Sequence, residues 1–177
     1  MTNMVRPKRT DRLIGIAAEM TAGDGEGDSL GFLGQALVQT TLPHSDPGVP
    51  FFERTSGAVS LLIIANPKFG LPFGTVPRLL LAWICTEAVR TKSPLLGLGR
   101  SQNEFLRKLG MRTDGRDCQR LRTQSLRLFS SMLSISYQSD GRVGLKNMPI
   151  ADESFVLWDP HRPDDRMLWE STLRLSA

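Results

Sequence analysis

Arginine side chains recur at helical spacing in the second half of this chain, and guanidinium groups bind phosphates and guanine edges through paired hydrogen bonds. On a helix over residues 116–129, with about 100° between successive residues, Arg116, Arg120 and Arg127 share one face. The opposite face is apolar or small and comprises Cys118, Leu121, Ser125, Leu128, Phe129 and Met132. This division predicts that the arginine face contacts DNA. The alternative is a solvated basic face, as found on many surface helices.

Two neutral polar residues accompany these arginines. Thr123 lies on the same face and Gln124 lies at its edge, where an amide can pair with adenine. The expected DNA-contacting residues are Arg112, Arg116, Arg120, Thr123, Gln124 and Arg127.

Charge is distributed unevenly along the chain, whose formal net charge is +4. Residues 78–127 contain eleven basic and four acidic residues, whereas residues 151–170 contain six acidic residues and two arginines. A basic half followed by an acidic segment indicates a polyanionic partner on one face.

Groups that would support catalysis or metal binding are scarce. The two histidines, His44 and His161, and the two cysteines, Cys85 and Cys118, have no metal-ligand spacing, and Tyr137 is the single tyrosine and lies in a strand pattern. We therefore expect no enzyme activity, no metal and no cofactor. The sequence contains no signal peptide and no apolar run of membrane length, so we expect a cytoplasmic protein with reduced cysteines and no disulfide.

Two further helices are predicted to position the basic helix. The almost wholly apolar run from Leu79 to Val89 predicts a buried helix over residues 77–92, with Thr75 as its cap and Trp83 in the core. Ser101 and Glu104 form a capping-box pattern that starts a short helix.

Strand patterns surround these helices. Residues 59–64 and 133–137 are predicted strands, and residues 155–158 and 167–175 are predicted to form a hairpin. The tip of this hairpin, residues 159–165, is acidic. Three helices followed by a hairpin predict an α+β fold of the winged-helix type, and an acidic wing tip would resist a phosphate backbone.

The N-terminal part has a different composition. Residues 1–29 combine a basic stretch with a Gly/Asp-rich linker, so we expect a flexible arm, followed by a short helix over residues 30–42. The predicted winged-helix domain covers residues 30–177.

Several motifs resemble the plasmid-encoded RepA replication initiators. The longest is the run over residues 69–93, FGLPFGTVPRLLLAWICTEAVRTKS, and shorter ones lie at residues 42–45, 103–110 and 158–160. The resemblance covers most of the chain from about Gly31 onward. The glycine-rich pair that the family has after Leu109 appears here only as Asp114-Gly115.

This resemblance implies tandem winged helices that bind repeated origin sites, with the N-terminal winged helix serving in dimerisation as well as DNA contact. The implied partners are double-stranded DNA, a second copy of the chain and host replication proteins, with no membrane. Family members are longer, so we expect a fragment or a short form that lacks the second winged helix. A second hypothesis remains open, in which this domain mainly dimerises and a missing C-terminal domain binds the origin.

Overall fold

The computed structural model describes residues 41–139, 142–156, 158, 162, 165 and 171–175. The arm expected over residues 1–29 lies outside these residues, and so does the helix expected over residues 30–42 apart from Thr41 and Leu42, which are not helical. Most of the expected hairpin tip and residues 166–170 also lie outside them.

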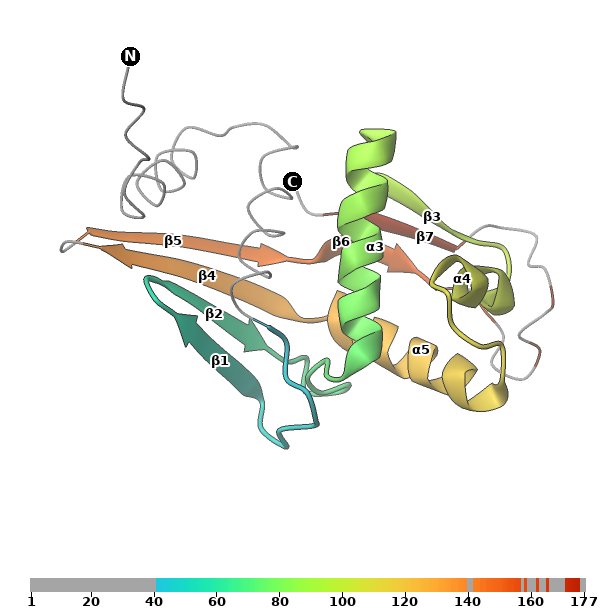
Figure 1. Cartoon of the computed structure of the whole chain (residues 1–177), viewed down its shortest axis with the longest axis horizontal. Coiled ribbons are helices and arrows are strands. Elements are labelled where there is room, and N and C mark those ends of the chain that lie inside the picture. The colour runs from blue at the N-terminus through green and yellow to red at the C-terminus, as the bar shows by residue number, and fades with distance from the viewer. Residues whose placement is uncertain are drawn as a thin grey trace, which may run out of the picture.

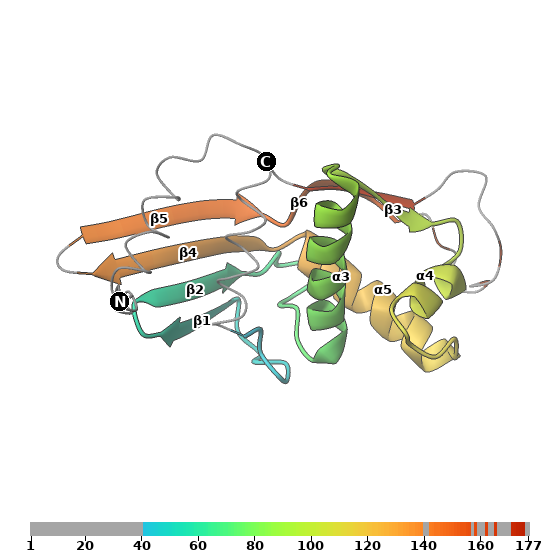
Figure 2. The same cartoon turned by 45° about the horizontal axis from the view of Figure 1, so that its top comes forward.

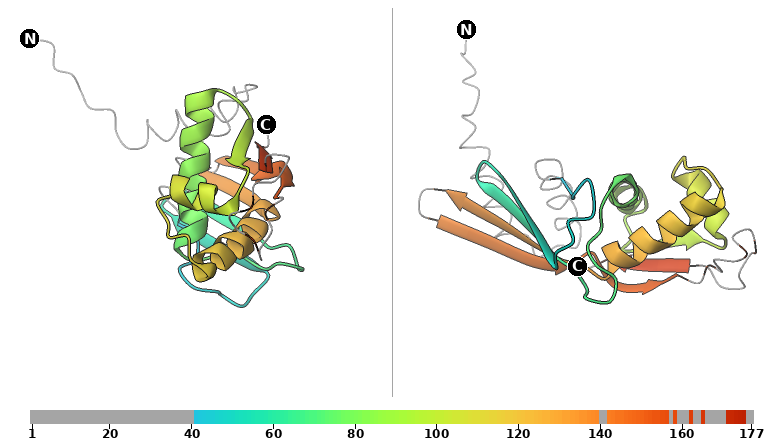
Figure 3. Two further views of the ribbon diagram at one scale, coloured as in Figure 1. Left: turned by 90° about the vertical axis from the view of Figure 1, so that its right-hand side faces the viewer. Right: turned by 90° about the horizontal axis from the view of Figure 1, so that it is seen from below.

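Two antiparallel sheets and three helices make up the described part of the chain, which confirms the expected α+β class (Figures 1 and 2). The first sheet has the order β1-β2-β4-β5 and consists of Phe51–Ser56, Val59–Ile64, Met132–Ser139 and Arg142–Pro149. The second has the order β3-β7-β6 and consists of Leu95–Gly99, Ser171–Leu175 and Ala151–Phe155. The helices are α3 (Thr75–Thr91), α4 (Gln102–Lys108) and α5 (Gly115–Phe129). Figure 3 shows the first sheet extending to one side of α3, with α4, α5 and the second sheet on the other.

Alternating side chains place one face of the first sheet in the core. The buried residues of β2 and β4 lie opposite one another in the register Val59–Tyr137, Leu61–Ile135 and Ile63–Leu133. These central strands were predicted from the sequence, whereas the flanking strands β1 and β5 were not. β1 follows a proline-rich stretch, and β5 contains Gly144, Lys146 and Asn147, which have low strand propensity.

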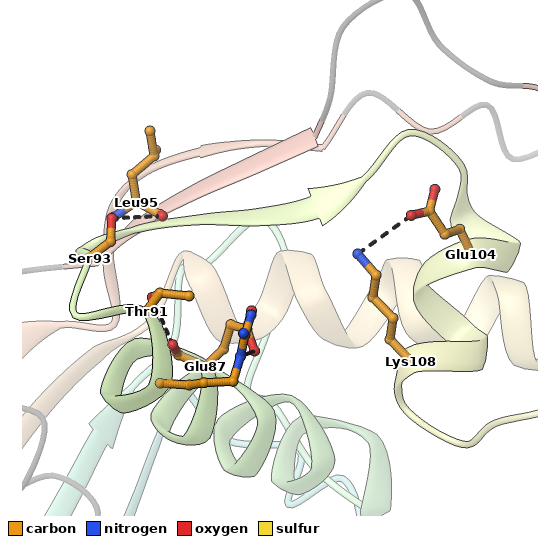
Figure 4. A network of polar contacts seen from close by, with 7 residues as sticks. Glu87, Thr91, Ser93, Leu95, Glu104 and Lys108 are labelled. Atoms are coloured by element: carbon orange, nitrogen blue, oxygen red, sulfur yellow. Dashed lines mark hydrogen bonds and ion pairs between the residues drawn. The ribbon is translucent and has the colours of Figure 1, made fainter.

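The helix α3 begins differently from the expectation and ends where it was expected, with Lys92 as its C-cap. Its N-cap is Gly74, at φ 84°, and no side chain caps the helix, so the prediction that Thr75 is the cap was wrong. Figure 4 shows its C-terminal end, where the Thr91 hydroxyl donates to the Glu87 carbonyl at 2.8 Å. The backbone then turns at Lys92, at φ 53°, and continues into β3.

The burial of α3 is also less complete than its apolar sequence predicted. Leu80, Leu81, Ile84 and Ala88 are buried in the core. An exposed stripe runs along the other side and comprises Thr75, Leu79, Ala82, Thr86 and Val89. The helix therefore has one solvent-facing side.

The short helix α4 brings aromatic side chains together. As predicted, the Ser101 hydroxyl caps it by accepting the Glu104 amide at 3.2 Å. Phe105 is fully buried, with its ring 4.9 Å from that of Trp83 and 5.3 Å from that of Trp158. Trp83 itself is half-buried at the edge of this cluster, so its predicted core position is confirmed in part.

The second sheet corrects the expectation for the C-terminal strands. Strand β7 pairs with β3 on one side and β6 on the other, so its described part offers no free edge. Leu173 and Leu175 are buried, as is Trp158. The strand expected over residues 155–158 instead ends at Phe155.

Candidate nucleic-acid interface

The N-terminal half of α5 presents basic side chains to solvent. Asp114 caps the helix by accepting the Asp117 amide at 2.8 Å, and this fixes where the helix starts. Arg116 and Arg120 are exposed, whereas Cys118 lies on the opposite, buried side. The division of faces predicted from the sequence holds for this half of the helix.

The exposed arginines are weakly engaged within the protein. Arg120 lies 3.6 Å from the Asp117 carboxylate, but its side chain is 65% exposed, and such surface ion pairs contribute little. Arg112, in the loop before α5, and Arg116 are exposed and have no ion-pair partner among the described residues. These guanidinium groups are free to bind an external anion.

Arg127 is turned inward, so its predicted place on the outward face was wrong. Its Nη1 donates to Asp46 Oδ2 and to the Leu71 carbonyl, both at 3.0 Å, and the group lies 4.9 Å from the centre of the Phe73 ring. The side chain is 19% exposed. Two loops cover the C-terminal half of α5 here, which helical periodicity cannot detect.

Gln124 is also engaged within the protein. Only 7% of it is exposed, and its Oε1 accepts the Phe73 amide at 2.9 Å. Thr123, one residue earlier, is half-exposed. Among the expected contact residues, the structure brings Arg112, Arg116, Arg120 and Thr123 to the surface and withdraws Gln124 and Arg127.

Asp46 is a residue of this region that sequence reasoning missed. The pKa of its carboxyl lies below the ordinary value of 3.8, because the Gly48 amide donates a hydrogen bond to it and the Arg127 guanidinium donates another. Asp46 and Arg127 are 81 positions apart, so no local pattern could have joined them.

More basic side chains border α5. Arg107 and Lys108 at the end of α4 are exposed, and Figure 4 shows Lys108 directed toward Glu104, at 3.5 Å. At the expected hairpin tip, Arg162 lies 3.6 Å from Asp165. The end of α4 thus adds two exposed basic side chains, Arg107 and Lys108.

A groove separates the start of α3 from the exposed face of α5. It has a volume of about 630 Å³. Its lining comprises His44, Phe73, Gly74, Thr75, Val76, Leu79, Met111, Asp117, Gln119, Arg120, Thr123 and Gln124. Most of these come from the two helix segments and the loop before α3.

Three helices and two antiparallel sheets, with a basic helix half exposed, define an α+β domain. Residues 71–177, more than half of the chain, match the family described as plasmid encoded RepA protein. The chain belongs to this family of plasmid replication initiators, which are generally non-catalytic DNA-binding proteins.

A crystal structure of domains 2 and 3 of RctB has a similar fold, with a TM-score of 0.50 and 10% sequence identity. The similarity covers 80% of this chain and 57% of the RctB chain, and at this identity it concerns the fold alone. No curated protein matches the chain. No helix among the described residues has the length and apolar character needed to cross a membrane.

Proposed function

We propose that this chain is the DNA-binding domain of a plasmid replication initiator and that it binds origin repeats through the N-terminal half of α5. The observation that carries the proposal is the joint exposure of Arg116 and Arg120 on the face opposite the buried Cys118. Arg112 and Thr123 extend this face at either end. Phosphates and base edges are the groups that such side chains bind.

In this proposal the domain is a winged helix. The helices α3, α4 and α5 are its three-helix core, α4 and α5 form the helix-turn-helix pair, and β6 and β7 form the wing together with β3. A recognition helix contacts bases mainly through its N-terminal residues. The exposed half of α5 is that half, and this supports its assignment as the recognition helix.

The proposed domain covers residues 30–177, preceded by the basic arm of residues 1–29. Its support is the shared core, because buried residues of both sheets and all three helices belong to one hydrophobic cluster. A single core favours a single folding unit. We place its action on plasmid DNA in the cytoplasm.

Fluorescence anisotropy tests the main proposal. The full chain should bind a duplex with two copies of the cognate origin repeat more tightly than a duplex of shuffled sequence and equal length. The affinity should fall steeply as salt rises, because phosphate contacts release counterions. Equal affinity for the two duplexes would show that this domain does not recognise the origin repeat. No binding at low salt would show that it does not bind DNA.

Self-association is a second candidate function, and a particular surface favours it. Phe51, Ile64 and Met132 lie side by side on neighbouring strands β1, β2 and β4, on the face of the first sheet away from the core. They are 56%, 47% and 43% exposed, and Pro149 of β5 continues the row. Contiguous exposed apolar residues are typical of protein-protein contacts.

Under this alternative the domain dimerises and a C-terminal domain carries origin recognition. Light scattering distinguishes the two functions when combined with the anisotropy titration. A dimer without repeat-specific binding supports the alternative, whereas repeat-specific binding by a monomer supports the main proposal alone.

A further inference from the structure

Gln119 is an exposed residue of α5 that was not among the expected contact residues. It lies in the N-terminal half of the helix, three positions after Arg116 and one before Arg120, and all three residues are exposed. Residues three and four positions apart are neighbours on a helix surface, so the Gln119 amide lies beside both guanidinium groups. Gln119 and Arg120 also line the groove between the start of α3 and α5.

The two glutamines of α5 are in opposite states. Gln124 is 7% exposed, and its Oε1 accepts the Phe73 amide at 2.9 Å. The Gln119 side chain has no hydrogen-bond partner among the described residues, so its oxygen and its NH2 group are both open to an external ligand. The pairing with adenine that the sequence assigned to Gln124 is therefore available to Gln119 instead.

The amide of Gln119 differs in chemistry from the arginines beside it. The guanidinium groups of Arg116 and Arg120 only donate hydrogen bonds, which suits phosphate oxygens. A glutamine amide donates through Nε2 and accepts through Oε1, and the major-groove edge of adenine offers the matching N7 acceptor and N6 donor. Contacts to phosphates position a protein on the duplex, whereas contacts to base edges specify the sequence. Gln119 has the chemistry of the second kind.

We propose that Gln119 reads an adenine of the origin repeat in the major groove. Its Oε1 accepts from adenine N6 and its Nε2 donates to adenine N7, while Arg116 and Arg120 bind backbone phosphates of the same duplex. The inference rests on the proposed function, since α5 has to enter the major groove for Gln119 to reach a base edge. It adds a base identity and the residue that recognises it.

A binding selection with the full chain tests the assignment. The probe is a library of duplexes with about ten randomised base pairs, one helical turn, and the bound duplexes are sequenced. Gln119→Ala should lose the preference for adenine at one position of the wild-type motif and keep the other preferences. Alanine is a good helix former at this exposed position, so the fold should be retained. Gln119→Glu should prefer cytosine at that position, because a carboxylate accepts from cytosine N4.

The matched control is Gln138→Ala, which removes an exposed glutamine side chain from β4. This variant should enrich the same motif as the wild type. Its melting temperature and that of Gln119→Ala, compared with the wild type, show that both variants are folded.

Fluorescence anisotropy on the enriched duplex separates base reading from phosphate contact. Replacing the adenine by guanine should weaken wild-type binding about tenfold and binding by Gln119→Ala much less. The salt dependence of binding by Gln119→Ala should equal that of the wild type, because no phosphate contact is lost. Arg116→Ala should instead give a salt dependence shallower by about 0.9, the value of one phosphate contact.

The outcomes distinguish this inference from the function on which it rests. Identical motifs for the wild type and Gln119→Ala would overturn the inference and leave the proposed function standing. A lost preference for a base other than adenine would do the same. A salt dependence shallower by about 0.9 in Gln119→Ala would make Gln119 a phosphate contact and also overturn the inference. No enriched motif for the wild type would overturn both the inference and origin recognition by this domain.

Discussion

Arg127 joins three parts of the molecule that are distant in sequence. It extends from α5 to Asp46 in one loop and to Leu71 and Phe73 in another. Because both loops precede α3, this one side chain orders the backbone around the start of that helix. Arg127 thus has a structural role in the fold, whereas the exposed arginines of α5 remain available for the proposed contact with DNA.

Arg127→Ala should therefore lower the stability of the fold. The expected loss in the free energy of unfolding is about 1.5–3 kcal/mol, the range for hydrogen bonds to charged groups. Urea denaturation measures it, and the control is Arg112→Ala, which removes an exposed arginine and should change stability little. Equal midpoints for the two variants would contradict the inward role of Arg127.

The same contact gives a pH dependence. The folded pKa of Asp46 is lowered, so its ionised form stabilises the fold above the ordinary value of 3.8, and this contribution is lost as pH falls through the folded pKa. Asp46→Asn should flatten the dependence of the urea midpoint on pH in this acidic range. A variant whose midpoint falls as steeply as that of the wild type would exclude Asp46 as a contributor.

The buried side of α5 and the exposure of Arg116 and Arg120 could be predicted from the 3.6-residue period alone. The inward turn of Arg127 and Gln124 could not, because it depends on loops that local periodicity does not describe. For the same reason, the contact between Asp46 and Arg127 could not be predicted. Residues placed by secondary structure were predictable, and residues placed by loop contacts were not.

At the scale of elements, the aromatic cluster between α3, α4 and the segment after β6 holds the helices against the second sheet. Its centre is Phe105, which is fully buried, and its edge is Trp83, which is half-buried. The two side chains differ in burial although both lie in apolar helical patterns.

Phe105→Ala should therefore cost about 3–5 kcal/mol of stability, as for other buried aromatic residues. The loss of stability should be smaller for Trp83→Ala than for Phe105→Ala, because Trp83 is already partly exposed to water. Chemical denaturation of both variants gives the comparison. A larger loss of stability for Trp83→Ala would show that Phe105 is not the centre of the cluster.

Elements with strong local signals were predictable. The two central strands of the first sheet and the capping of α4 by Ser101 follow from strand propensity and the capping box. The strands β1 and β5 could not be predicted, because they depend on pairing with β2 and β4 rather than on their own composition. The three-stranded order β3-β7-β6 likewise arises from contacts between distant segments.

At the scale of the whole molecule, two surfaces lie on different elements. The basic face belongs to α5 and its neighbours, and the exposed apolar row belongs to the first sheet. Because the two surfaces are separate, the proposed DNA binding and the proposed self-association should be altered by different substitutions.

Ile64→Lys combined with Met132→Lys should convert a dimer to a monomer, because two charges would enter the centre of the apolar row. Light scattering across a range of protein concentrations reports the change, and Val89→Lys, on the exposed side of α3, serves as the control. A wild-type monomer at all concentrations, or a dimer that persists in the double variant, would contradict this assignment.

Contact between the exposed half of α5 and origin DNA is tested by the salt dependence of binding for the variant that combines Arg116→Ala with Arg120→Ala. This double variant should bind more weakly than the wild type, with a slope of log affinity against log salt that is shallower by about 1.8, or about 0.9 for each lost phosphate contact. The control removes two exposed basic residues elsewhere, Arg54→Ala with Lys68→Ala, and should keep a slope near that of the wild type. Equal slopes in the two double variants, with both proteins folded, would show that the exposed half of α5 is not the DNA-contacting surface.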